Sequence, residues 1–228
     1  MQRILVINPN STEAVTRAID QAVESLRSPA GPEIACVTLK EGPPGIETDQ
    51  HTLDVVEPLC KMVAREEGRT AAFVDACFSD PGLSVMRERT AKPVFGIAES
   101  GLLTALAIGR RVGVISILET SVVRHLRYFD ALGIAERIAG DLAVGLGVRD
   151  VAEGVKTYQR MSDVGRALRD DKGADVLVLG CAGMSQHRKR LEDELRVPVV
   201  DPTQVTVGMA VTAVRLGYRR AQPTPAAA

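Results

Sequence analysis

Two of the four cysteines, Cys77 and Cys181, each follow a short apolar run that has the length of a buried strand. One run begins at Ala71 and the other at Ala174, and a glycine-containing loop and a charged helical pattern follow each cysteine. A thiol is an acid that donates a proton, and its thiolate is a base that accepts one. Placed on the two sides of a cleft, this pair would serve as an acid and a base for one carbon atom.

Such a pair suits the inversion of a carbon next to a carbonyl group. Inversion needs a base on one face, a proton donor on the other and stabilisation of the enolate between them. A helix N-terminus lowers the pKa of a thiol from about 8.5, and its N–H groups bind an enolate oxygen. We expect Asp80 to cap a helix behind Cys77, with Pro81 in its first turn, and Ser185 to cap a helix behind Cys181.

The other two cysteines, Cys36 and Cys60, lack this placement, because one lies inside a strand pattern and the other inside a helical pattern. We interpret them as ordinary free thiols of the core. No C-x-x-C pair or secreted disulfide framework is present. His51, His125 and His187 show no metal-ligand spacing, and we expect them on the surface or in helices. These residues therefore imply no metal site.

The elements that position the two thiols occur twice along the chain. Arg3–Thr12 aligns with Arg111–Thr120, and the order strand, helix, strand, helix, strand with cysteine, helix, Pro-initiated strand repeats. The apolar runs are continuous, as in parallel strands that helices cover on both faces. We predict an α/β fold of two pseudo-symmetric lobes, each a parallel sheet flanked by helices, with the active site in the cleft between them.

The length of 228 residues suits two compact lobes. We assign residues 1–98 and 206–220 to the first lobe, 99–205 to the second and 221–228 to a flexible tail. With 28 basic and 29 acidic residues, the chain has no charge excess for nucleic acid, and its apolar runs are too short to span a membrane. We expect a cytoplasmic homo-oligomer that binds a small molecule; the sequence gives neither the number of subunits nor the preferred enantiomer.

Ligands of parallel sheets bind at the carboxyl ends of the strands. The candidate substrate-binding residues at these ends are Asn8, Asn10, Ser11, Phe78, Ser79, Thr120, Gly180, Ala182 and Gly183. The loops contain neutral donors and acceptors and no Lys or Arg, which suits a neutral ring. A zwitterionic amino acid would need another group to hold its carboxylate, although backbone N–H groups at a helix start are sufficient.

Several of these positions also have a purely structural interpretation. Asn8 and Asn10 fit a turn in which Ser11 or Thr12 caps the next helix, and Phe78 fits the core as well as contact with a planar ring. The Gly/Pro-rich segment 41–48 fits a lid over the cleft or a plain connecting loop. No phosphate-binding glycine motif is present, so we do not expect a nucleotide.

Three segments, Ile7–Ser11, Ala76–Leu83 and Leu179–Met184, resemble signature segments of the hydantoin racemase branch of the aspartate/glutamate racemase superfamily. The resemblance extends from about residue 2 to about residue 217. It implies two similar α/β lobes, no cofactor, and two cysteines that act as base and acid on opposite faces of the substrate. At the matching positions these are Cys77 and Cys181.

The chain departs from the amino-acid racemase branch at Ala182–Gly183, where that branch carries a Thr-His pair. We therefore expect a cofactor-independent racemase of a 5-substituted hydantoin or a related cyclic ureide. The alternatives are an aspartate/glutamate-type racemase, or a decarboxylase or cis–trans isomerase of the same superfamily. A decarboxylase needs only one proton donor, so the second cysteine counts against it. From a different class, a small-molecule sensor also fits two lobes around a cleft.

Overall fold

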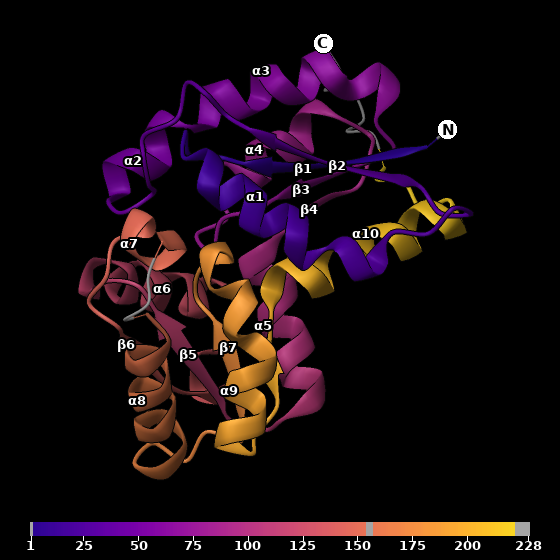
Figure 1. Cartoon of the computed structure of the whole chain (residues 1–228). Coiled ribbons are helices and arrows are strands. Elements are labelled where there is room, and N and C mark those ends of the chain that lie inside the picture. Colours follow the sequence, from indigo (N-terminus) through magenta and orange to yellow (C-terminus); the bar gives the residue numbers. More distant parts are fainter. Residues whose placement is uncertain (1, 154–156, 222–228) are drawn as a thin grey trace.

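The computed structural model describes residues 2–153 and 157–221. Two lobes are each built on a four-stranded parallel sheet (Figure 1). The strand order is β2-β1-β3-β4 in the first sheet and β6-β5-β7-β8 in the second, so the second sheet repeats the arrangement of the first. The predicted α/β fold of two similar parallel lobes is confirmed.

The first lobe contains β1 (Arg3–Asn8), α1 (Glu13–Ala22), β2 (Glu33–Thr38), α2 (Asp49–Asp54), α3 (Val56–Glu66), β3 (Ala72–Asp75), α4 (Leu83–Arg89) and β4 (Val94–Gly96). Helix α5 (Ile97–Ile108) leads to β5 (Val112–Ser116), α6 (Glu119–Ala131), β6 (Ile138–Ala143), α7 (Val148–Glu153), α8 (Thr157–Asp170), β7 (Val176–Leu179), α9 (Arg188–Leu195) and β8 (Val199–Val200). Short 3-10 helices span Glu24–Leu26, Glu67–Arg69, Ala135–Arg137 and Ala182–His187, the last of which is η4.

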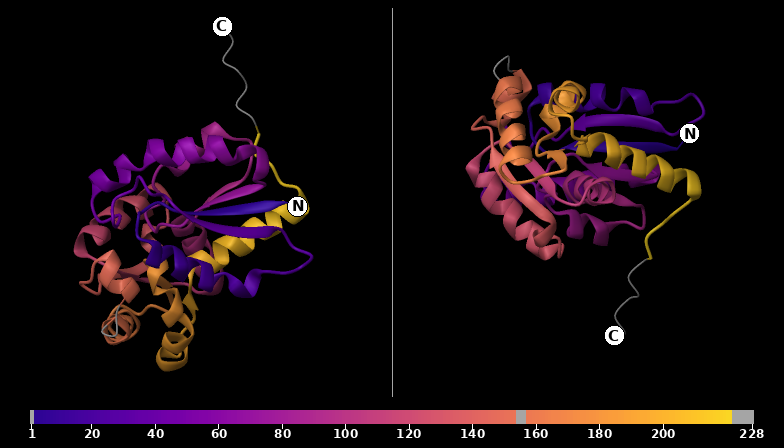
Figure 2. Two further views of the ribbon diagram at one scale, coloured as in Figure 1. Left: turned by 45° about the horizontal axis from the view of Figure 1, so that its top comes forward. Right: turned by 90° about the horizontal axis from the view of Figure 1, so that it is seen from below.

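The last helix, α10 (Pro202–Leu216), returns to the first lobe and packs on β1, β3 and α5 (Figure 2). The lobe boundaries at 98/99 and 205/206 stay predictions, and they fall inside α5 and α10. The predicted tail lies outside the described residues except for Ala221. Within the described ranges, no helix combines the length and the apolar character that a membrane span requires.

The central strand β1 shows why the continuous apolar runs become buried strands. Ile4 and Val6 belong to the core on one face of the sheet, and Leu5 and Ile7 belong to the core on the other. Successive side chains of a strand point to opposite faces, so helices on both faces require apolar residues at every position. The equivalent strand β5 is buried along its whole length for the same reason.

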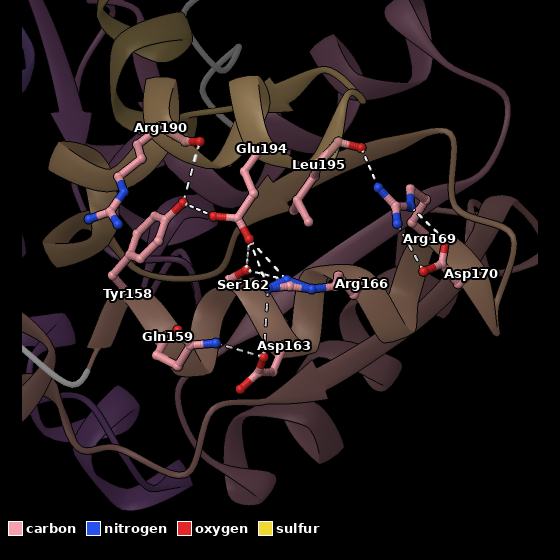
Figure 3. A network of polar contacts seen from close by, with 10 residues as sticks. All are labelled: Tyr158, Gln159, Ser162, Asp163, Arg166, Arg169, Asp170, Arg190, Glu194 and Leu195. Carbon is pink, nitrogen blue, oxygen red and sulfur yellow. Dashed lines mark hydrogen bonds and ion pairs between the residues drawn. The ribbon is translucent and has the colours of Figure 1, made fainter.

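In the second lobe, Glu194 of α9 ties this helix to α8 (Figure 3). Its carboxylate accepts hydrogen bonds from the hydroxyls of Ser162 and Tyr158 and from Arg166 at 2.8 Å. These bonds, that of Ser162 first, lower the pKa of Glu194. Because α9 packs against η4, the network also supports the segment that follows Cys181.

Candidate active site

A narrow cavity lies between the two lobes. It is lined by Asn10, Val15, Ile46, Ala76, Cys77, Phe78 and Ser79 of the first lobe and by Ile117, Ser121, Arg124, His125, Val148, Gly180, Cys181 and Ala182 of the second. The structure thus brings together most of the site residues that the sequence predicts. It leaves four of them out of the lining: Asn8, Ser11, Thr120 and Gly183.

The cavity has a volume of about 30 Å³, whereas ligand pockets usually have roughly 300–1,000 Å³. A second cavity of about 380 Å³ shares Ser79, Arg124 and His125 with it. An organic substrate between the cysteines therefore requires the walls to separate. The shared residues show that the second cavity adjoins the first.

Cys77 and Cys181 stand at equivalent places in the two sheets. Strand β3 ends at Asp75 and strand β7 ends at Leu179, so each strand ends two residues before its cysteine. Strands β3 and β7 pair with the central strands β1 and β5 in the same order. Both thiols are free and both line the cavity, one from each lobe. This arrangement presents one thiol from each lobe to the cavity.

Burial raises the pKa of both thiols. For Cys181 the pKa rises to about 11, opposed by a hydrogen bond from the N–H of Gly183. The pKa of Cys77 is also raised, first by burial and then by the charge of Asp75, and the N–H of Ser79 opposes the shift. Our prediction that the following segments lower both values is wrong, because the lost hydration of each sulfur outweighs one donated N–H.

We predicted that Asp80 caps the helix behind Cys77, and this prediction is wrong. Helix α4 has Gly82 at its N-cap, in the left-handed conformation with a φ of 69°, and no side-chain cap. The Asp80 carboxylate instead accepts the N–H groups of Ala98 and Glu99, at 2.9 Å and 2.8 Å, where α5 begins. It also accepts the hydroxyl of Tyr128 in α6 at 2.7 Å. Asp80 thus ties the turn after β3 to α5 and to the second lobe.

This long-range cap depends on Gly96. A Cβ atom at Gly96 would lie 2.2 Å from the carboxyl carbon of Asp80, so a larger residue would displace the carboxylate. Burial raises the pKa of Asp80 to about 6, although the donated hydrogen bonds act in the opposite direction. The charged carboxylate of Asp80 therefore loses favourable hydration when the protein folds.

Asp75 is a second buried acid in this region. It is fully buried, and neither of its carboxyl oxygens has a hydrogen-bond partner. Burial, and then the charge of Asp80, raise its pKa well above the ordinary range. Burial thus disfavours the charged form of this carboxyl group. In the part of the chain that the structure describes, no three His, Cys, Asp or Glu side chains gather as metal ligands.

The turn after β1 is held by its own side chains. Asn8 Nδ2 donates to Asn10 Oδ1 at 3.2 Å, and Asn10 Oδ1 accepts the N–H of Thr12 at 3.0 Å. Thr12 occupies the N-cap position of α1 without a side-chain cap, because its hydroxyl donates to the carbonyl of Pro44. The turn interpretation therefore holds for Asn8, whereas Asn10 also lines the cavity.

The 41–48 loop contacts both lobes and closes one side of the cavity. Ile46 is buried and lines the cavity. The Glu47 carboxylate accepts the N–H of Val148, at the start of α7, at 2.8 Å. The loop is therefore more than a plain connection, because it joins the lobes over the site.

Two of the residues outside the lining hold this loop instead. The N–H of Ser11 donates to the carbonyl of Pro43 at 2.9 Å, and the Thr120 hydroxyl donates to the carbonyl of Glu47 at 3.0 Å. Thr120 is exposed at the start of α6. Both residues therefore shape a wall of the cavity from outside it.

Around the second cysteine, Gly180 allows close packing. A Cβ atom there would lie 2.7 Å from the carbonyl oxygen of Ile115 in β5. The predicted cap at Ser185 is wrong, because its hydroxyl donates to the carbonyl of Ala182 at 2.9 Å within η4. The helix α9 begins only at Arg188, so a 3-10 turn follows Cys181.

His125 is buried in α6, with 2% of its surface exposed, so the prediction of a helix is right and that of a surface position is wrong. Its Nδ1 lies 2.8 Å from Asp141 Oδ2 and 3.1 Å from the Ser116 hydroxyl. The ring of Phe78 meets the imidazole edge to face, with 5.1 Å between centroids. Phe78 belongs to the core and also lines the cavity, and its contact with a planar ring of the substrate stays a prediction.

Arg124 brings a positive charge to the cavity. The strand-end loops contain no Lys or Arg, but α6 turns Ser121, Arg124 and His125 towards the site. The composition of the loops therefore does not describe the whole cavity, and the argument from it for a neutral ring is incomplete. The spacing i, i+3, i+4 places these three residues on one helix face, and that spacing is the signal in the sequence that points to Arg124 and His125.

Comparisons with known proteins agree with this geometry. Residues 4–210 match the family described as Asp/Glu/Hydantoin racemase. The hydantoin racemase of Pseudomonas sp. (strain NS671) is 35% identical over 95% of this chain and 88% of its own length. The structure of allantoin racemase from Klebsiella pneumoniae has a TM-score of 0.91 and 30% identity, and covers 100% of this chain and 96% of its own. For allantoin racemase from Pseudomonas fluorescens the TM-score is 0.90 and the identity 26%, with coverage of 100% and 99%.

Proposed function

The chain belongs to the Asp/Glu/hydantoin racemase family and is an isomerase of the racemase type. On that premise, we propose that it inverts a 5-substituted hydantoin or a related cyclic ureide. In this proposal Cys77 and Cys181 act as acid and base, and no cofactor takes part. The observation that carries the proposal is the matched position of the two thiols. Each follows the equivalent strand of its lobe by two residues, and both line one cavity.

In the proposed reaction, the thiolate of one cysteine removes the proton from the carbon next to the ring carbonyl. The electron pair moves onto the carbonyl oxygen as an enolate, and the other cysteine returns a proton to the opposite face. Each turnover exchanges the protonation states of the two thiols, so the reverse reaction starts from the other cysteine. Backbone N–H groups in the turns after the cysteines are suitable donors to the enolate oxygen.

The substrate class rests on two arguments. First, relatives similar over nearly the whole chain are named hydantoin racemase and allantoin racemase, and both names denote cyclic ureides. Second, Ala182–Gly183 provides no extra acid or base beside Cys181. A neutral ureide needs less help than an amino acid, whose carboxylate opposes the formation of a carbanion. Arg124 weakens the argument from charge alone, so free aspartate and glutamate belong in the test.

The test measures racemisation by polarimetry for a panel of 5-substituted hydantoins, allantoin, aspartate and glutamate. Cys77→Ser and Cys181→Ser are then assayed in D₂O on each enantiomer of the best substrate. Each variant should lose several orders of magnitude in racemisation, and each should still exchange deuterium into one enantiomer, of opposite hand for the two variants. Cys36→Ser and Cys60→Ser are the matched controls, because these thiols lie outside the cavity.

Near-normal racemisation by either cavity variant would refute the two-cysteine mechanism. Faster racemisation of a free amino acid than of any ureide would refute the substrate class alone. Decarboxylation of a malonate-type substrate without racemisation would favour the decarboxylase alternative. Binding of a ureide without any solvent exchange would favour a sensor.

A further inference from the structure

Arg124 is held in place by neutral oxygens. Its Nη1 donates to the carbonyls of Glu47 and Thr120, at 2.9 Å and 3.1 Å, and its Nη2 donates to the Ser121 hydroxyl at 3.2 Å. Only 9% of the residue is exposed. Among the described residues, no carboxylate lies within ion-pair distance of this guanidinium, and its buried Nε has no hydrogen-bond partner.

A buried charge without an opposite charge is costly, so structures rarely keep one without a use. The acids of the neighbouring segments are engaged elsewhere. Asp49 accepts Arg127 at 2.8 Å, the Glu47 carboxylate accepts the N–H of Val148, and that of Asp80 accepts the start of α5. The positive charge of Arg124 is therefore available to an anion inside the cavity.

The cavity contains two thiols, Cys77 and Cys181, whose anions need such support, because burial disfavours both thiolates. Cys77 lines it together with Arg124, and burial disfavours its thiolate. Burial lowers the pKa of the Arg124 guanidinium, and the negative charges of Cys77, Asp49 and Glu47 raise it, that of Cys77 most. The other titratable groups around Cys77 are Asp75, Asp80, His125 and Cys181. None of these is a permanent cation, and the two aspartates oppose the thiolate.

We infer that Arg124 is the electrostatic partner of Cys77, placed by α6 to stabilise its thiolate and so to make Cys77 a base. This inference rests on the proposed two-cysteine mechanism. Arg124 acts through the thiol and is therefore a positioning residue of the site. Its three neutral contacts keep the guanidinium in position without neutralising it, which an ion pair with a carboxylate would do.

The test follows the alkylation of Cys77 by iodoacetamide as a function of pH, without substrate, with the modified cysteine identified by peptide mass spectrometry. Only the thiolate reacts, so the midpoint of the rate–pH curve reports the thiol pKa, whereas a change in access scales the whole curve. The variants are Arg124→Gln and Arg124→Lys. Arg127→Gln is the matched control, because it removes the same charge from an exposed position of the same helix.

In Arg124→Gln the midpoint should move to higher pH, with at least about tenfold less thiolate at pH 8. Arg124→Lys should restore most of the reactivity, and Arg127→Gln should change it less than about twofold. An unchanged midpoint in Arg124→Gln would overturn the inference. Because this assay contains no substrate, it is independent of whether the enzyme racemises ureides.

A second variant covers the case in which Arg124→Gln does not fold. Ser121→Asp keeps the guanidinium and gives it a carboxylate neighbour, because the Ser121 hydroxyl already contacts Nη2. Neutralisation should shift the Cys77 midpoint in the same direction as removal of the charge. If neither variant shifts the midpoint, while Arg124→Lys raises the KM of a carboxylate-bearing hydantoin, Arg124 binds the substrate and the inference is wrong.

Discussion

Replacement of Asp80 by Asn should make the protein less sensitive to rising pH. The carboxylate of Asp80 is buried between the turn after β3, the start of α5 and Tyr128. Burial raises its pKa from the ordinary 3.8 to about 6. The folded state therefore holds this proton more tightly than the unfolded state does.

The sign and size of the effect follow from that difference. Below about pH 4 the carboxyl group is protonated in both states and does not make stability depend on pH. Between pH 4 and pH 6 the unfolded chain releases the proton first, so the folded state loses stability as the pH rises. A shift of about two units, at 1.36 kcal/mol per unit, corresponds to a loss of ~3 kcal/mol in the free energy of unfolding.

The assay is urea unfolding of the wild type and of Asp80→Asn at pH 4, 5, 6, 7 and 8. Most other groups titrate equally in both proteins, so the difference between the two unfolding free energies reports Asp80. Asp75 adds to it in the same direction, because its raised pKa falls when the charge of Asp80 is removed. The variant should gain ~3 kcal/mol relative to the wild type between pH 4 and pH 7. Asp54→Asn, at an exposed carboxylate of α2, is the control and should show a nearly constant difference.

A difference that stays constant with pH would refute the reasoning. The opposite slope, with Asp80→Asn becoming relatively less stable as the pH rises, would show that the N–H groups of α5 and the Tyr128 hydroxyl outweigh burial. In that case Asp80 would be a stabilising helix cap of the usual kind.

Three further predictions concern the substrate and two other acids. Turnover of a 5-alkyl hydantoin should exceed that of aspartate or glutamate at least about a hundredfold, which is roughly 2.7 kcal/mol of transition-state stabilisation. The reason is that Ala182–Gly183 offers no acid–base assistance to an amino acid. Polarimetry measures the two rates, and equal rates would contradict the prediction. Asp75→Asn should gain stability relative to the wild type as the pH rises from 4 to 7, because the buried carboxyl group of Asp75 holds its proton more tightly in the folded state than in the unfolded chain. Denaturant unfolding at both pH values measures this, and an equal gain at both would contradict it. Glu194→Gln should destabilise the protein by no more than about 1 kcal/mol at pH 7, and by less as the pH falls below 4. The reason is that the pKa of Glu194 is lowered in the folded state. Thermal melts measure this, and a loss of stability that grows on acidification would contradict it.

Much of the fold was predictable from local patterns. The apolar run at Ile4–Ile7 became the central strand β1, and the repeated order of elements became two sheets with the same strand order. The positions of Cys77 and Cys181 behind equivalent strands follow from the same repeat. These features depend on periodicity and on the direction of parallel strands, which a single segment already contains.

The electrostatics of the site were decided by packing. The charge of Arg124 reaches the cavity because α6 faces it, and the Asp80 carboxylate caps α5 because Gly96 leaves room for it. Both thiols are buried at a cavity that residues of both lobes and Ile46 of the 41–48 loop line together. Sequence determined which groups stand at the strand ends, whereas the tertiary structure determined their neighbours and their hydration. A pKa depends on the neighbouring groups and on hydration, because charge and solvent act through space and not along the chain.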